Sequence, residues 1–80
     1  MLQLRIVSPT KVVYTGEVDS IEVPGYSGRF EVLNHHAAIL SLLVKGNVRY
    51  KNAEGEHSVA IEGGFITVKN NEVTLSVEQE

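Results

Sequence analysis

Short runs of valine, isoleucine and threonine, separated at brief intervals by glycine, proline and asparagine, recur along the whole sequence. β-Branched side chains are stiff at the first side-chain torsion and suit a pleated sheet. Residues 2–7 alternate apolar and polar side chains with a period of two, which is typical of a half-buried strand. No amphipathic stretch of three helical turns interrupts these runs. The sequence therefore predicts an all-β fold.

Turn residues divide the chain into the expected strands. Asn70 and Asn71 tolerate positive φ and predict a two-residue hairpin, residues 52–56 predict a longer hairpin loop, and Gly63-Gly64 predicts a corner. Strands are expected at residues 2–7, 11–14, 17–23, 29–33, 48–51, 58–61, 65–69 and 72–77. The apolar run 37–44 fits either a buried strand or a short buried helix. The expected architecture is a sandwich, or flattened barrel, of two antiparallel sheets with about eight to ten short strands.

Length and charge exclude several classes of function. The 80 residues form one expected domain, 1–80, with a single modest core and no room for a catalytic cleft between domains. Seven Lys and Arg against ten Asp and Glu give a net charge of −3, which disfavours binding to nucleic acid. There is no cysteine for a disulfide or a thiolate metal site. Because no targeting segment and no apolar run of about 20 residues is found, we expect a cytoplasmic chain that meets a membrane only through a partner.

The histidines are the only candidates for metal chemistry. His35 and His36 follow Glu31 closely, but neighbouring residues of an extended chain point to opposite faces and do not converge on one ion. His57 stands alone beside a turn. No serine lies in a nucleophile elbow, and the glycine pairs lack the lysine and helix of a phosphate-binding loop. We therefore expect no catalytic, cofactor-binding or metal-binding residue.

The run 37–44 is apolar on both faces if it forms a strand, in a protein too thin to cover both. Two explanations remain open. One face meets another protein, or loops of the same chain cover it.

Across essentially all 80 residues, the sequence resembles the N-terminal domain of the epsilon subunit of F-type ATP synthase. The central segment is similar to the family pattern G-x-x-G-x-[LF]-x-[IV]-L-P-x-H-A-P-[LI]-[LV]. The matching segments, in order, are 4–9 (LRIVSP), 14–18 (YTGEV), 25–40 (GYSGRFEVLNHHAAIL), Lys45-Gly46, 62–65 (EGGF) and 70–75 (NNEVTL). Three positions depart from the pattern, because Asn34 and Ala38 stand where the family has proline and His35 where glycine is frequent.

The resemblance implies a two-sheet sandwich and a mechanical function. The chain would be a non-catalytic rotor subunit of the central stalk, joining gamma to the c ring in proton-coupled ATP synthesis, with no cofactor and no small-molecule substrate. It would lie on the cytoplasmic face of the bacterial inner membrane as a peripheral part of the complex. By similarity, Ser8, His36 and Ser41 would contact gamma, whereas Tyr26, Ser27, Arg29 and Glu31 would contact the c ring. The family's C-terminal helices have no counterpart here, so inhibition and ATP sensing are not expected.

Two other classes remain as alternatives. One is a free-standing small β module that binds a peptide or ligand at a sheet edge. The other is a small metal-dependent enzyme that uses His35, His36 and Glu31.

Overall fold

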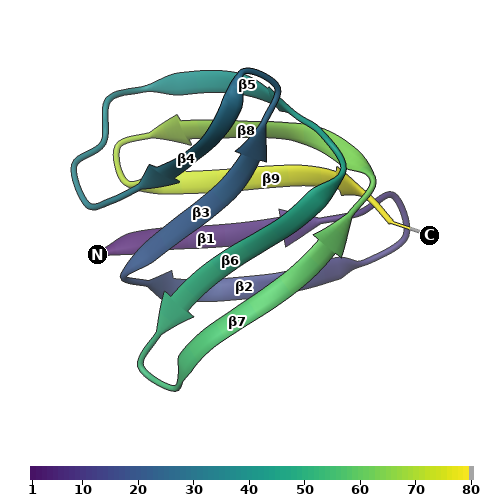
Figure 1. Cartoon of the computed structure of the whole chain (residues 1–80). Coiled ribbons are helices and arrows are strands. Elements are labelled where there is room, and N and C mark those ends of the chain that lie inside the picture. The colour runs from purple at the N-terminus through teal and green to yellow at the C-terminus, as the bar shows by residue number, and fades with distance from the viewer. Residues whose placement is uncertain (80) are drawn as a thin grey trace.

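The computed structural model describes residues 1–79, which form nine strands and no helix (Figure 1). The strands are β1 (Leu2–Val7), β2 (Val12–Val18), β3 (Ser20–Gly25), β4 (Gly28–Val32), β5 (Ile39–Leu43), β6 (Gly46–Asn52), β7 (Gly55–Ile61), β8 (Gly63–Lys69) and β9 (Glu72–Glu78). Accordingly, this part of the chain contains no helix that could span a membrane. The prediction of an all-β protein is confirmed.

The strands form one curled sheet in the order β2-β1-β9-β8-β5-β3-β6-β7, with β4 paired to β3. A single residue pair, Gly25 with Leu43, joins β5 to β3, and the sheet folds over at this point. Figure 1 shows the result: β4, β3, β6 and β7 cross in front of β5, β8, β9, β1 and β2. This is the expected sandwich. One feature differs from the expectation, because β1 pairs with β9 in parallel, whereas the other pairings between described strands are antiparallel.

The core lies between the two layers and is filled by the inward side chains of the alternating strands. In β1, for example, Leu2, Leu4 and Ile6 are at most 1% exposed, while Gln3 and Arg5 face outward. The buried hydrophobic residues are Leu2, Leu4, Ile6, Val18, Ile21, Val23, Val32, Leu43, Val48, Tyr50, Ile61, Ile66, Val68, Val73, Leu75 and Val77. The alternation therefore identifies one core face on every strand.

The expected strand boundary near Gly16 is wrong. β2 continues through Gly16 to Val18, and the chain turns at Asp19, whose amide donates to the carbonyl of Lys51 at 2.7 Å. Gly16 serves a different purpose, because a Cβ at this position would lie 2.7 Å from the Tyr14 hydroxyl. This glycine makes room for an aromatic side chain and does not form a turn.

The other turns agree with the sequence in part. Asn70 and Asn71 have φ of 51° and 62°, which confirms the tight hairpin between β8 and β9. The 52–56 loop is shorter than expected, because β6 ends at Asn52 and β7 begins at Gly55. The predicted corner lies just before Gly63-Gly64 and not at these residues, since both glycines belong to β8. Gly64 has φ of 146°, and a Cβ there would collide with the Ser76 carbonyl.

Candidate functional site

The outer side of β5 and β8 carries a patch of exposed hydrophobic side chains, which we call the apolar face. Leu40 is 73% exposed, Leu42 is 62% exposed and Phe65 is 43% exposed. Leu42 lies directly opposite Phe65 in the β5–β8 ladder. Together with Ser41, these three residues line a shallow hollow of about 510 Å³. Large side chains of this kind, left open to solvent, mark a surface for a protein partner.

The pleat of β5 explains this exposure. The ambiguous run 37–44 is a strand over Ile39–Leu43, in which Leu43 faces the core while Leu40 and Leu42 point the opposite way. The described chain leaves them exposed, so the alternative in which loops of the same chain cover this strand is wrong. An uncovered apolar side of this strand is what the other explanation, contact with another protein, requires.

Two further hollows flank the apolar face. One, of about 360 Å³, is lined by Val7, Ser8, Pro9, Gly64, Phe65, Ser76, Val77 and Glu78, and so shares Phe65 with the apolar face. The other, of about 490 Å³, is lined by His35, His36, Ala38, Lys69, Asn70 and Asn71 near the start of β5. The apolar face is thus the middle of a longer uneven surface.

Of the three residues expected to contact gamma, Ser8 and His36 line the flanking hollows, and Ser41 lies in the strand that carries Leu40 and Leu42. Ser8 lines the hollow that contains Phe65, and its hydroxyl donates to the carbonyl of Lys11 at 3.3 Å. Ser41 is half-buried and paired with Ile66, on the side of β5 opposite to Leu40 and Leu42. His36 lines the third hollow, where its Nδ1 lies 2.7 Å from the Ala37 carbonyl oxygen. The sequence did not single out Phe65, although Leu42 and Phe65 lie at outward positions of adjacent strands.

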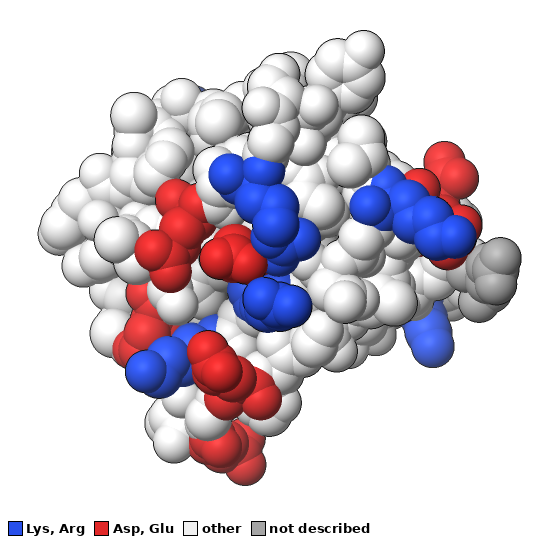
Figure 2. Space-filling view, viewed as in Figure 1, with Lys and Arg blue, Asp and Glu red and all other residues white. Residues whose placement is uncertain are grey.

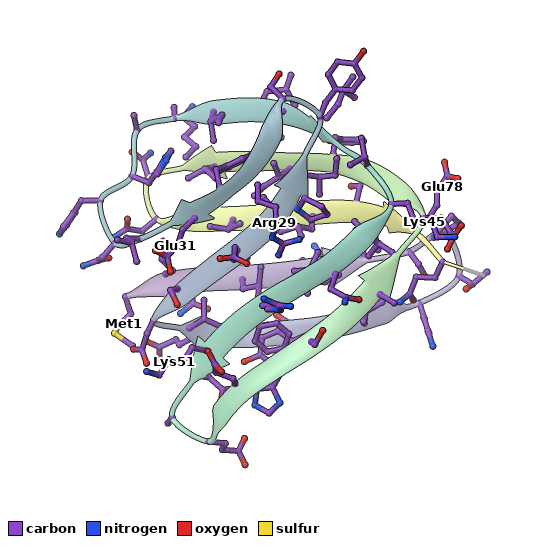
Figure 3. All side chains as sticks on the ribbon, in the orientation of Figure 1. Met1, Arg29, Glu31, Lys45, Lys51 and Glu78 are labelled. Carbon is purple, nitrogen blue, oxygen red and sulfur yellow. The ribbon has the colours of Figure 1, made fainter. Side chains whose placement is uncertain are left out.

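The outer side of the opposite layer is charged, and we call it the charged face. Figure 2 shows acidic and basic side chains gathered over the centre and lower part of this layer, while the upper part carries almost no charge. Arg29, Glu31 and Lys51, labelled in Figure 3, lie on this face. Glu22 and Arg49 complete it, because Glu22 pairs in register with both Glu31 and Arg49.

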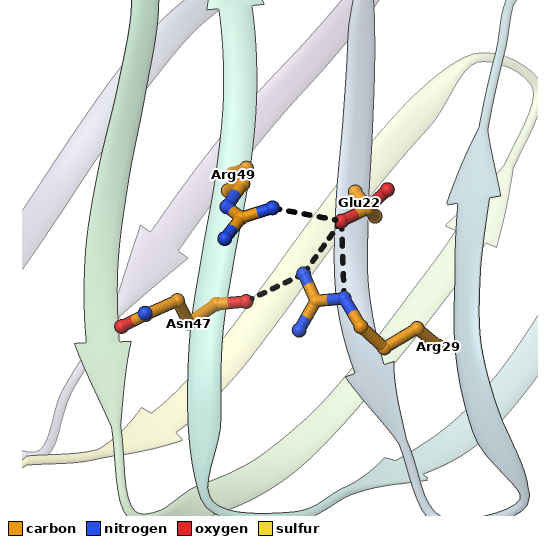
Figure 4. Close-up of polar contacts among 4 residues, drawn as sticks. All are labelled: Glu22, Arg29, Asn47 and Arg49. Carbon is orange, nitrogen blue, oxygen red and sulfur yellow. Dashed lines mark hydrogen bonds and ion pairs between the residues drawn. The ribbon is translucent and has the colours of Figure 1, made fainter.

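Arg29 is held at the centre of the charged face by other residues of the same chain (Figure 4). Its Nε and Nη2 donate to Glu22 Oε1 at 3.0 and 2.8 Å, and Nη2 also donates to the Asn47 carbonyl at 2.9 Å. Arg49 Nη1 approaches the same carboxylate oxygen at 3.7 Å. No sequence pattern singled out Glu22 or Asn47. The register of the β3–β4 hairpin is the signal for Glu22, because it places residues 22 and 29 diagonally across the two strands.

The residues expected to contact the c ring fall into two groups. Tyr26 and Ser27 are exposed in the turn between β3 and β4, with Tyr26 at 73% exposure. The Tyr26 amide donates to the Leu42 carbonyl at 2.9 Å, which places this turn at the border of the apolar face. Arg29 and Glu31 lie on the charged face. The structure therefore does not bring all four residues together on one surface.

An aromatic stack lies where β2 meets β6 and β7. The ring centroids of Tyr14 and Tyr50 are 4.4 Å apart, and those of Tyr50 and His57 are 5.1 Å apart. Asn52 links the ends of the stack, since its Nδ2 donates to the Tyr14 hydroxyl at 3.2 Å and its Oδ1 lies 3.1 Å from His57 Nε2. Burial, and secondarily the Tyr14 phenol, raise the pKa of Tyr50 above 10.0. Tyr50 is therefore a neutral phenol at physiological pH.

Within residues 1–79, no group of three or more His, Cys, Asp or Glu side chains is arranged to hold a metal ion. What the described residues do present is a rigid two-layer sandwich with an apolar face and a charged face. This combination defines a small all-β interaction domain.

Comparison with known proteins identifies the family. The family model for the β-sandwich domain of the ATP synthase delta/epsilon chain matches residues 1–79. The chain belongs to this family.

Similar curated proteins are ATP synthase epsilon chains. The chain from Leptospira borgpetersenii is 40% identical over 74 residues, which cover 92% of this chain and 58% of the relative. The chain from Nitratidesulfovibrio vulgaris is 42% identical over 77 residues, which cover 96% of this chain and 58% of the relative. The present chain thus spans little more than half the length of these relatives. The epsilon chain of Chlorobium limicola is 40% identical over 77 residues, covering 95% of this chain and 88% of the relative.

Solved structures share the fold at low sequence identity. A chain of the Euglena gracilis mitochondrial ATP synthase, in a structure of OSCP, F1 and the c ring, superposes with a TM-score of 0.91 at 20% identity, covering 98% of this chain and 51% of that chain. A chain in a structure of the central stalk and c ring of the Tetrahymena thermophila mitochondrial ATP synthase gives a TM-score of 0.80 at 18% identity. The superposition covers 98% of this chain and 63% of that chain.

Proposed function

We propose that this chain acts as the sandwich domain of an epsilon subunit in the central stalk of an F-type ATP synthase. It joins gamma to the c ring, turns with them, and supports proton-coupled ATP synthesis without contributing a catalytic group. In a bacterium it lies at the cytoplasmic face of the inner membrane and reaches that membrane only through the complex. The family match and the central-stalk origin of the Tetrahymena structure support this proposal.

The apolar face is the observation that carries the proposal. Burying one large aliphatic or aromatic side chain contributes about 1.5–3 kcal/mol, so covering Leu40, Leu42 and Phe65 supplies a substantial driving force for association. Such side chains at the centre of an interface are typical of stable contacts, which a rotor needs in order to transmit torque. We assign gamma to this face, with Ser8 and His36 at its borders and Ser41 in the strand that carries Leu40 and Leu42.

The charged face suits a different kind of contact. Alternating acidic and basic side chains, open to water, favour a polar interface whose strength depends on ionic strength. We assign Arg29 and Glu31 to the polar loops of the c ring, together with Tyr26 and Ser27 of the β3–β4 turn. Because Arg29 is already bound to Glu22 and Asn47, its remaining N–H groups are held in place as donors toward the ring.

The proposal is tested by binding the purified chain separately to the gamma subunit and to the detergent-solubilised c ring of the same organism. We expect a stable complex with gamma, and a weaker, salt-sensitive complex with the ring. A chain that binds neither, but binds extended peptides along a sheet edge, would support the free-standing module instead. Among the described strands, β2, β4 and β7 each pair on one side only and offer such edges.

A further inference from the structure

The loop between β4 and β5 contains a turn whose sequence is unsuited to its conformation. The His36 amide donates to the Leu33 carbonyl at 3.1 Å, which closes a four-residue turn over residues 33–36. His35, the third residue of the turn, has a positive φ of 65°, whereas the φ of Asn34, the second residue, is not positive. This is the geometry of a type II turn, in which proline favours the second position and glycine the third. Asparagine and histidine occupy them here.

A side chain from another turn compensates for this mismatch. Asn71 Oδ1 accepts a hydrogen bond from the His35 amide at 2.7 Å, and Asn71 Nδ2 donates to Asn34 Oδ1 at 2.7 Å. The two bonds contact both central residues of the turn. Histidine in the left-handed region is strained, because its Cβ crowds the following carbonyl, so these bonds hold a conformation that the local sequence does not favour.

Asn71 is itself fixed by the sheet. It occupies the two-residue hairpin between β8 and β9, where its own φ of 62° suits asparagine. Its carbonyl accepts the Gln3 amide at 2.8 Å, which ties the same residue to β1. The amide group of Asn71 therefore projects from a rigid corner where three strands meet, and it fixes the neighbouring loop relative to that corner.

We infer that Asn71 is a positioning residue for gamma binding, an inference that rests on the proposed function. It holds residues 33–36 so that His36 and the first residues of β5 keep the position that the apolar face requires. Asn71 also lines the hollow that contains His36 and Ala38, at the end of this surface. Without Asn71, the loop samples other conformations before each encounter, and only the fraction in the correct form binds.

The test uses Asn71→Gly, because glycine keeps the positive φ of the hairpin and removes only the amide group. We expect about tenfold weaker binding to gamma and at least tenfold faster hydrogen exchange of the His35 amide, since the strain at His35 is then unopposed. The matched control is Asn70→Gly, which changes the same hairpin but leaves both Asn71 bonds in place. Its binding and exchange should equal those of the unsubstituted chain.

A rescue variant separates positioning from general stability. Asn34→Pro with His35→Gly gives the turn its preferred residues, so adding this pair to Asn71→Gly should restore the affinity for gamma to within twofold. Urea unfolding of Asn71→Gly should match that of Asn70→Gly. Unchanged gamma binding in Asn71→Gly, or no recovery in the rescue variant, overturns the inference. If the unsubstituted chain does not bind gamma, the proposed function fails, and the exchange of the His35 amide alone then decides whether Asn71 holds the turn.

Discussion

The apolar face and the charged face are built from the same kind of strand and differ in the side chains that point outward. On β5 and β8 the outward positions hold Leu40, Leu42 and Phe65, whereas on β3 and β4 they hold Glu22, Arg29 and Glu31. The buried side chains of both layers are hydrophobic. In Figures 1 and 2, the strands of the charged layer lie in front and carry the mixed charges toward the viewer.

This difference shows that fold and function reside in alternate residues of the same strands. Because successive side chains point to opposite faces, the inward set specifies the sandwich and leaves the outward set free to specify partners. An apolar outward set supplies binding energy, whereas a charged one supplies orientation and salt-dependent contacts. Substitutions at outward positions should therefore change partner binding and leave the fold intact.

The largest expected effect is at the apolar face. Leu42→Asp should weaken gamma binding by roughly 30-fold or more, about 2 kcal/mol, because a carboxylate replaces a central hydrophobic contact. The melting temperature of the free chain should hardly change, since Leu42 is 62% exposed. Titration calorimetry with gamma measures the first effect, and thermal unfolding the second.

The matched control for Leu42→Asp is Val12→Asp, which replaces an exposed hydrophobic residue on β2, three strands away from β8 in the sheet. It should bind gamma normally. Equal losses in both variants would show that the apolar face is not the gamma-binding surface. Ser41→Trp is a poorer probe, because Ser41 faces away from Leu42 and a bulky ring there also disturbs packing between the layers.

A smaller effect is expected at the charged face. Arg29→Glu should weaken c-ring binding by about 1 kcal/mol, roughly fivefold, and the loss should vary with salt because the contact is charged. The variant also places two carboxylates side by side, since Arg29 now contacts Glu22. Pull-downs with the solubilised ring at two salt concentrations measure the loss. Lys11→Glu, which makes the same change of charge in the exposed loop between β1 and β2, serves as the control and should bind the ring normally.

The assignment of the two faces is contradicted if Arg29→Glu abolishes gamma binding while ring binding persists. It is equally contradicted if Leu42→Asp spares gamma and abolishes ring binding. Either result would exchange the two surfaces without changing the family.

A still smaller effect concerns the ion pair itself. Glu22→Gln should reduce the free energy of unfolding by less than about 1 kcal/mol, because an exposed ion pair is screened by water. The side chains of Arg29 and Glu22 are 40% and 39% exposed. Urea unfolding measures the change, with Glu54→Gln in the β6–β7 turn as the control. A loss well above this range would mean that the network stabilises the layer as strongly as its core does.

The smallest expected effect is a loss of folding stability at alkaline pH. Since the folded chain raises the pKa of Tyr50 above 10.0, its neutral phenol stabilises the fold fully below pH 10, and this contribution is lost as the pH rises through the folded-state pKa. Tyr50 belongs to β6 of the charged layer, so amides of β6 and β7 should lose exchange protection before those of β5 and β8. Tyr50→Phe should remove this difference. Equal loss in both layers at all pH values would contradict it.

The short-range patterns predicted most of the fold. The alternation in residues 2–7 and the Asn70-Asn71 hairpin are present as expected, because a period of two and tolerance of positive φ are local properties. The prediction was wrong near Gly16, where the glycine accommodates the Tyr14 ring and the strand continues. No local pattern distinguishes a glycine that forms a turn from one that makes room for a side chain.

The candidate site was less predictable, because it depends on contacts between distant residues. The sequence drew attention to Ser41, but the strand register places Leu42 and Phe65 on the outside instead. The resemblance assigned Arg29 to the c ring and gave it no partner within the chain, whereas folding brings Glu22 and Asn47 to it. The turn at His35 is a similar case, since its partner Asn71 lies 36 residues further along the chain.

The sequence by itself determined that this protein is an all-β domain and which side of an alternating strand such as residues 2–7 faces the core, and it marked the run 37–44 as unusually apolar. These properties follow from side-chain chemistry and the period of the backbone. The tertiary structure alone decided which strands are neighbours, including the parallel pairing of β1 with β9, and hence which outward residues form the apolar and charged faces. The physical reason is that a face is made of side chains from different strands, and their register is set only when the sheet closes around its core.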